Sequence, residues 1–257
     1  MSEITETRLT LDGGRVISCR YVDGNAPCIV FLHGTLSDKN ASKSLFLQTF
    51  CMETHQAFCS FDFTGHGDSS GKYTEATVGI WLQDALGVLD KAVEKEAVLV
   101  GSSMGGWIML LAAMLRPQKV VGCLGIAAAP DFTTDVWNAF SPEQKKAVLT
   151  QGIVYTPNGW TPEGDPWTFS LFEDAKNYLM LDKKVEIHCP VVLLHGDKDN
   201  CVPVTTAFKI KDAVTTDDVK ILVVKNGTHR FSSAQELEIV RDTTVLLLKH
   251  IAEKNAV

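Results

Sequence analysis

The sequence lacks a surplus of positive charge. Its 257 residues contain 24 lysine and arginine residues against 31 aspartate and glutamate residues, which gives a formal net charge of −7. No local run of basic residues offsets this balance. A surface that binds nucleic acid needs clustered cations to neutralise phosphates, so we expect no nucleic-acid partner. A small-molecule or neutral acyl substrate fits this composition better.

The first twenty residues lack a long apolar stretch. They carry Glu3, Glu6 and Asp12 and show neither a secretory signal nor an arginine-rich transit peptide. We therefore expect a cytoplasmic protein without stable membrane insertion. The seven cysteines form no C-x-x-C pair and are odd in number, so we expect reduced thiols rather than disulfides or a zinc site. The oligomeric state stays open.

Short apolar runs alternate with helical patterns along the chain. Ile4 to Leu11 and Arg15 to Val22 flank Asp12-Gly13-Gly14, a composition that predicts a β-hairpin. Six further runs are short and unalternated, as in strands buried on both faces: 28–32, 58–63, 98–100, 120–127, 191–194 and 219–224. Helical patterns cover 38–54, 75–94, 104–115, 204–213 and 233–253. The sequence predicts an α/β fold, with helices on both faces of an eight-stranded, mostly parallel sheet.

One interval interrupts this alternation. No strand pattern appears at 131–186, a segment too long for an ordinary connection, so we expect a small helical cap inserted between core segments 1–130 and 187–257. Prolines and glycines in its middle predict an irregular loop between helices. Its aromatic residues could form a core of their own. We expect some of them to line a substrate pocket, together with Leu36: Trp137, Trp160, Trp167 and Phe172.

The motif Gly101-Ser102-Ser103-Met104-Gly105 joins the apolar run at 97–100 directly to a helical pattern at 107–115. In a sharp strand-to-helix turn, the middle residue is lifted off the sheet in a strained conformation, and small flanking residues avoid collisions. Ser103 has glycine two residues away on both sides, so it is the predicted nucleophile. Ser102 is the neighbouring alternative.

A second G-x-S-x-G pattern, Gly67 to Gly71, contains Ser69. It follows Thr64-Gly65-His66 rather than a strand, and no apolar helix comes after it. The context therefore favours Ser103 over Ser69.

A serine nucleophile needs an imidazole to accept its proton and a carboxylate to orient that imidazole. His229 lies between the last predicted strand and the final helix, where a base of this kind is required. For the other six histidines we prefer structural interpretations in loops, strand ends or helices. Asp199 follows the strand at 191–194 and is the expected acid, with Asp197 and Asp131 as alternatives.

Two backbone N–H groups should face the oxyanion that forms when a carbonyl is attacked. Met104 directly follows the predicted nucleophile and supplies one of them. Thr35 is the expected second donor, because Gly34 lets the backbone turn inward after the strand at 28–32. Leu36 is the alternative donor.

Several motifs together resemble a serine α/β-hydrolase over nearly the whole chain: Leu32 to Thr35, Asp62 to Gly71, Gly101 to Gly106, Leu194 to Pro203 and Gly227 to His229. Three segments further resemble the palmitoyl-protein thioesterase and acyl-glucuronide esterase group, whose animal members are mitochondrial: Gly101 to Trp107, Gly125 to Phe132 and Leu171 to Asn177. Serine aminopeptidase-like and lysophospholipase-like hydrolases share the broader motifs.

The residues and the resemblance together predict a carboxylesterase or thioesterase. Ser103 would attack an ester or thioester carbonyl, His229 would shuttle the proton, and water would release the acid from an acyl-enzyme, with no cofactor or metal. The aromatic cap predicts an apolar acyl or aryl group. Aminopeptidase-like or carbon–carbon bond hydrolysis on the same triad, and ligand binding with little turnover, are the alternatives.

Overall fold

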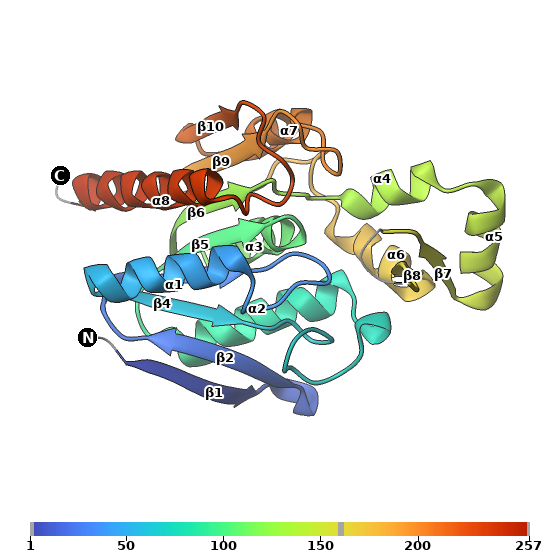
Figure 1. Cartoon of the computed structure of the whole chain (residues 1–257), viewed down its shortest axis with the longest axis horizontal. Coiled ribbons are helices and arrows are strands. Elements are labelled where there is room, and N and C mark those ends of the chain that lie inside the picture. The colour runs from blue at the N-terminus through green and yellow to red at the C-terminus, as the bar shows by residue number, and fades with distance from the viewer. Residues whose placement is uncertain (1–2, 159–161, 256–257) are drawn as a thin grey trace.

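An eight-stranded sheet runs through the molecule, with helices on both faces (Figure 1). The structure is a computed structural model that describes residues 3–158 and 162–255. Its strands are β1 (Ile4–Thr10), β2 (Val16–Val22), β3 (Asn25–Leu32), β4 (Gln56–Phe61), β5 (Ala97–Ser102), β6 (Val120–Ile126), β9 (Val191–Gly196) and β10 (Val219–Val224). Their order in the sheet is β1-β2-β4-β3-β5-β6-β9-β10. The β1–β2 and β2–β4 pairs are antiparallel and the others are parallel, which confirms the predicted sheet.

Two apolar layers hold the helices against this sheet. In β3, Ile29 and Phe31 pack toward the helices at 42–54 and 234–255, whereas Val30 and Leu32 pack toward the helices at 78–92 and 104–115. Because both faces of the strand are buried over residues 28–32, all five residues there are apolar. The helices are α1 (Ser42–Thr54), α2 (Val78–Ala92), α3 (Met104–Leu115), α7 (Thr205–Ala213) and α8 (Ala234–Asn255), with short 3-10 turns η1 (Asp12–Gly14) and η2 (Tyr73–Glu75).

The segment between β6 and β9 forms a separate group of elements to one side of the sheet (Figure 1). It contains α4 (Phe132–Ala139), α5 (Pro142–Gln151), β7 (Ile153–Thr156), β8 (Asp165–Thr168), α6 (Phe169–Ala175) and η3 (Lys176–Tyr178). The expected absence of strands here was wrong, since β7 and β8 pair antiparallel. A two-stranded ladder tolerates the proline at its edge, here Pro166 opposite Tyr155. We propose that residues 131–186 act as a cap on a core of 1–130 and 187–257.

None of the helices that the structure describes combines the length and the apolar content needed to span a lipid bilayer.

Candidate active site

Ser103 lies in the sharp turn between β5 and α3. Its backbone has φ 54° and ψ −121°, an unusual conformation for a residue with a side chain, and its N–H donates to the carbonyl of Ile126 at 3.0 Å. A Cβ at Gly101 would collide with the Gly105 carbonyl, and a Cβ at Gly105 would collide with the Leu32 carbonyl. The two glycines of the motif are therefore required by backbone packing around this turn.

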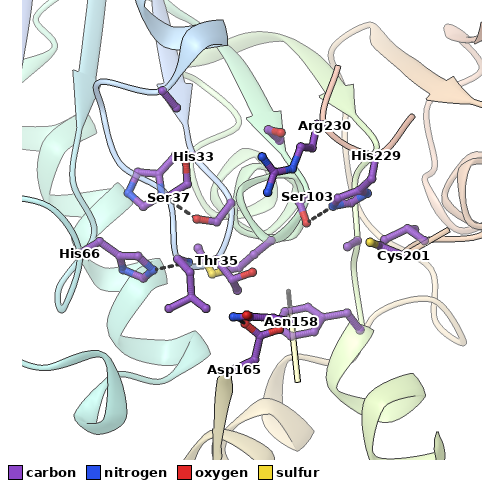
Figure 2. A pocket seen from close by; sticks show the side chains of 18 of the residues that line it. His33, Thr35, Ser37, His66, Ser103, Asn158, Asp165, Cys201, His229 and Arg230 are labelled. Carbon is purple, nitrogen blue, oxygen red and sulfur yellow. Dashed lines mark hydrogen bonds between the residues drawn. The ribbon is translucent and has the colours of Figure 1, made fainter. Parts of the chain in front are cut away.

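The structure brings together the three side chains expected to act as nucleophile, base and acid. The Ser103 hydroxyl donates to His229 Nε2 at 3.0 Å (Figure 2), and His229 Nδ1–H donates to Asp199 Oδ2 at 2.8 Å. They come from three separate chain positions: the β5–α3 turn, the loop after β9 and the loop after β10. Because parallel strands end at the same edge, these loops meet above the sheet.

The Asp199 carboxylate is fully buried. Its Oδ1 accepts hydrogen bonds from the backbone N–H groups of Cys201 and Val202, both at 2.8 Å. Burial by itself raises the pKa of Asp199, but hydrogen bonds from His195, His229 and Val202 outweigh this effect and hold the pKa well below its usual range. The carboxylate therefore stays ionised and orients His229.

The alternative aspartates have other partners in the structure. Asp197 Oδ1 accepts the N–H of Asn226 at 2.6 Å, which fixes the turn after β10. Asp131 accepts the N–H groups of Met180 and Leu181, and so links the two ends of the insertion. The contact with His229 is made by Asp199 instead.

Glu236 holds the loop that carries His229, a role that we did not predict from the sequence. Its carboxylate accepts hydrogen bonds from Thr228 N, Ser232 N and both N and Oγ of Ser233, while Ser233 Oγ accepts from Glu236 N. This is a capping box at the start of α8. The spacing Ser233-x-x-Glu236 before a helical pattern is the sequence signal that could have revealed it.

The loop after β3 passes directly against Ser103. A Cβ at Gly34 would lie 3.1 Å from Ser103 Cβ, so only glycine fits without displacement of Ser103. The backbone N–H of Leu36 donates a hydrogen bond to His66 Nε2 at 3.1 Å (Figure 2). Thr35 and Met104 line the cleft beside Ser103, whereas the alternative donor Leu36 already has a partner for its N–H.

A cleft of about 1070 Å³ lies between the sheet edge and the 131–186 segment, and Ser103 and His229 line it. Of the five residues expected to bind substrate, Leu36 and Trp167 line the cleft. Trp160 lies outside the described residues.

For two of those residues the expected place was wrong. Trp137 and Phe172 are absent from the cleft wall, and they pack instead against Phe140, with ring centroids 6.2 Å and 5.7 Å away. The physical reason is that a segment this small must bury its own aromatic side chains to hold its shape.

The cleft also has a polar wall that we did not predict from the sequence. Asn158 Nδ2 donates to Asp165 Oδ1 at 2.7 Å, and both side chains point toward Ser103 from the 131–186 segment (Figure 2). Arg230 extends over the cleft from the opposite side, directly after His229 (Figure 2). Asn158 and Arg230 lie in loops, and Asp165 begins the four-residue strand β8, which is too short for a periodicity to appear. The sequence therefore contained no signal for these residues.

Within the described parts of the chain, one group of side chains could supply metal ligands. Ligand atoms of Asp199, Cys201 and His229 all lie within 4.8 Å of one another. Asp199 and His229 already share a hydrogen bond, and Asp199 Oδ1 has two backbone donors. The ligand atoms of Asp199 and His229 are thus already hydrogen-bonded within the protein.

Residues 29–241 match the model of the alpha/beta hydrolase family. This chain belongs to the α/β-hydrolase family. The mitochondrial palmitoyl-protein thioesterase ABHD10 of Bos taurus is 35% identical over 225 residues, which is 87% of this chain and 74% of that protein. These findings confirm the resemblance to the hydrolase superfamily and to its thioesterase group.

Two solved structures are similar over almost their full length. Mouse alpha/beta hydrolase domain-containing protein 10 has a TM-score of 0.90 and 33% identity, with 96% of this chain and 99% of that chain covered. A putative hydrolase from Agrobacterium vitis S4 has the same TM-score and coverage at 29% identity. Both support the α/β-hydrolase fold.

The cytoplasmic location expected from the sequence is contradicted. The ABHD10 relatives from cattle, orangutan and human are all named as mitochondrial proteins. The expectation rested on the composition of twenty residues, and targeting segments are separate from the folded domain. The fold and the site therefore carry no information about the cellular compartment of the protein.

Proposed function

We propose that this protein is a serine hydrolase that cleaves carboxylic esters or thioesters through an acyl-enzyme intermediate. The observation that carries the proposal is the continuous hydrogen-bonded line from Ser103 Oγ through the His229 ring to the buried Asp199 carboxylate. A serine hydroxyl is a weak nucleophile at neutral pH, and a neutral imidazole 3.0 Å away can accept its proton during attack.

In the first step, Ser103 Oγ forms a bond to the carbonyl carbon while its proton moves to His229 Nε2. The Thr35 and Met104 N–H groups stabilise the resulting oxyanion, and the N-terminal end of α3 adds a favourable dipole. His229 then protonates the departing oxygen or sulfur, which leaves an acyl group on Ser103. In the second step, His229 takes a proton from water while the water oxygen bonds to the acyl carbon. The bond between that carbon and Ser103 Oγ then breaks, His229 returns the proton to Oγ, and the acid is released.

The substrate class follows from the two walls of the cleft and from the relatives. Trp167 and Leu36 offer apolar surface, which favours an apolar acyl or aryl group. The polar wall of Asn158, Asp165 and Arg230 is suited to a hydrophilic leaving group. Because the relatives are named palmitoyl-protein thioesterases, we propose thioesters with an apolar acyl chain as the first class to assay.

The test compares Ser103→Ala with Ser69→Ala. Ser69 stands in the second G-x-S-x-G pattern, but its hydroxyl donates to the Asp62 carbonyl and accepts from Ser18 N, so it is a matched structural control. Ser103→Ala should abolish hydrolysis of p-nitrophenyl esters and acyl thioesters, and also labelling by a fluorophosphonate probe. Ser69→Ala should keep both. Turnover that survives in Ser103→Ala would reject the proposal.

A panel of acyl esters, acyl thioesters and amino-acid amides at equal concentration then separates esterase from aminopeptidase-like activity. The proposal expects ester and thioester turnover that rises with apolar acyl size. A wild-type protein that is neither labelled nor active would instead support a binding role for this fold.

A further inference from the structure

His66 lies next to the loop that follows β3 and is one of the residues that line the cleft (Figure 2). Its side chain is buried, and its Nε2 accepts the hydrogen bond from Leu36 N at 3.1 Å. The ring of Tyr73 packs edge-on against this imidazole, with the two ring centroids 5.2 Å apart. His66 is therefore a fixed acceptor under a backbone N–H of the loop at 33–36.

The tautomer of His66 follows from its second contact. Nδ1 lies 3.3 Å from the Thr64 carbonyl, which can only accept, so Nδ1 carries the proton and Nε2 presents its lone pair to Leu36. Burial, together with the neighbouring His33, lowers the pKa of His66 to about 3. The ring is therefore neutral at physiological pH, as an acceptor must be.

Leu36 needs such a restraint. Its φ of 52° lies in the left-handed region, which is unfavourable for a residue with a branched side chain. Side-chain packing supplies little support, because Leu36 is 47% exposed. The hydrogen bond to His66 fixes the orientation of the peptide unit between Thr35 and Leu36.

The preceding peptide unit is fixed from the other side. His33 Nδ1 lies 2.7 Å from the Gly34 carbonyl oxygen, and His33 Nε2 accepts the N–H of Phe63 at 3.1 Å. The Gly34 carbonyl and the Thr35 N–H belong to one planar peptide, so they point in opposite directions. With the carbonyl held by His33, the Thr35 N–H points the other way. Both peptide units around Thr35 are thus anchored by buried imidazoles.

We propose that His66 is a positioning residue for the oxyanion site: by holding Leu36 N–H it directs Thr35 N–H toward the carbonyl oxygen of the substrate. The inference rests on the proposed function, because it assumes an oxyanion at this place. The two neighbouring N–H groups then have different roles. Leu36 N–H anchors the loop, and Thr35 N–H faces the reaction.

The experiment compares His66→Leu, which removes the acceptor and fills the space, with His66→Gln, whose amide oxygen can reach the position of Nε2. His66→Leu should lower kcat for a p-nitrophenyl ester about 100-fold with KM unchanged, since loss of one oxyanion donor costs roughly 10²–10³ in rate. The affinity for a trifluoromethyl ketone, which forms an oxyanion on Ser103, should fall by the same factor. His66→Gln should recover activity to within about tenfold of wild type.

Ser69→Ala is the matched control, because it removes two hydrogen bonds of the 62–71 loop without contact with Leu36. If this variant lowers kcat as much as His66→Leu does, the loss of activity comes from a general loosening of the 62–71 loop, and the inference fails. Wild-type kcat and ketone affinity in folded His66→Leu would also overturn it. His66→Asn, too short to reach Leu36, replaces His66→Leu if that variant does not fold. Failure of both to fold would assign His66 a structural role and count against positioning.

The two proposals fail in different ways. An inactive wild type that does not react with the fluorophosphonate probe rejects the hydrolase assignment. An active wild type with an equally active His66→Leu rejects only the role of His66.

Discussion

His195 Nε2 lies 3.3 Å from Asp199 Oδ2, the same oxygen that accepts the hydrogen bond from His229 Nδ1. His195 Nε2 also donates to the carbonyl of Val202 at 2.9 Å, which identifies it as the protonated nitrogen. The proposed acid is therefore held between two imidazoles. From the sequence we expected His195 only to end a buried strand, and its contact with Asp199 emerges from the fold.

Replacement of His195 by phenylalanine should weaken this support. A hydrogen bond to a charged group contributes about 1.5–3 kcal/mol, so kcat/KM for an activated ester should fall roughly 10- to 100-fold. Steady-state kinetics measure the effect. His250→Phe is the matched control, because it removes a histidine that bonds another aspartate, Asp218, away from the cleft. Equal activity of the two variants would contradict the importance of the His195 contact.

Exchange of the two loop aspartates for asparagine should separate their roles. Asp199→Asn should reduce kcat by about 10⁴, because the amide no longer fixes the required tautomer of His229. Asp197→Asn should stay within a few-fold of wild type, because the Asp197 side chain accepts only a backbone N–H of the β10 turn in the contacts described. Single-turnover assays with a chromogenic ester measure both. The opposite ranking would reassign the acid to Asp197.

Mild acid should destabilise the protein through its buried histidines. Burial lowers the pKa of His33 to about 4 and that of His66 to about 3, whereas an unfolded histidine has a pKa of about 6.5. Between these values the unfolded chain binds more protons. The stability that these neutral rings contribute is thus complete above about pH 6.5 and is lost as pH falls toward the folded pKa values.

Urea unfolding at several pH values from about 7.5 down to about 5 measures this dependence. In the pH range where an imidazole is protonated in the unfolded chain but neutral in the folded protein, the free energy of unfolding should fall by about 1.4 kcal/mol for each unit by which the pH is lowered. This applies to each of the two imidazoles. His66→Gln should lose one such contribution and show a shallower slope. A wild-type free energy of unfolding that does not change over this range would disprove the expectation.

Two tryptophans of the 131–186 segment should affect activity differently. Trp167 lines the cleft and also packs against Phe140 and Phe172, whereas Trp137 packs in this aromatic cluster and does not line the cleft. Trp167→Ala should lower kcat/KM for long acyl or aryl esters about tenfold more than for acetyl esters, because an apolar contact is lost only with the larger groups. Trp137→Ala should lower the melting temperature and leave unchanged the ratio of kcat/KM for long acyl or aryl esters to kcat/KM for acetyl esters. A changed ratio in Trp137→Ala alone would show that the cluster faces substrate.

The parts of the fold that local pattern encodes could be predicted. Residues 28–32 of β3 and the helix α3 each form a continuous apolar run, because they are buried on more than one side. The β7–β8 pair was missed, because its strands are four residues long and β8 contains Pro166. Short strands carry too few alternations for a pattern to appear, and their pairing depends on the segment around them.

The sequence by itself determined the order serine, aspartate, histidine at three strand ends and the glycines that the turn around Ser103 requires, because backbone sterics and strand burial act on neighbouring residues. Only the tertiary structure decided that Asp199 rather than Asp197 reaches His229, that Trp137 turns away from the cleft, and that His66 accepts from Leu36. These outcomes depend on side-chain direction and on contacts between segments far apart in the chain. Such contacts arise from the packing of the whole domain, which no local pattern records.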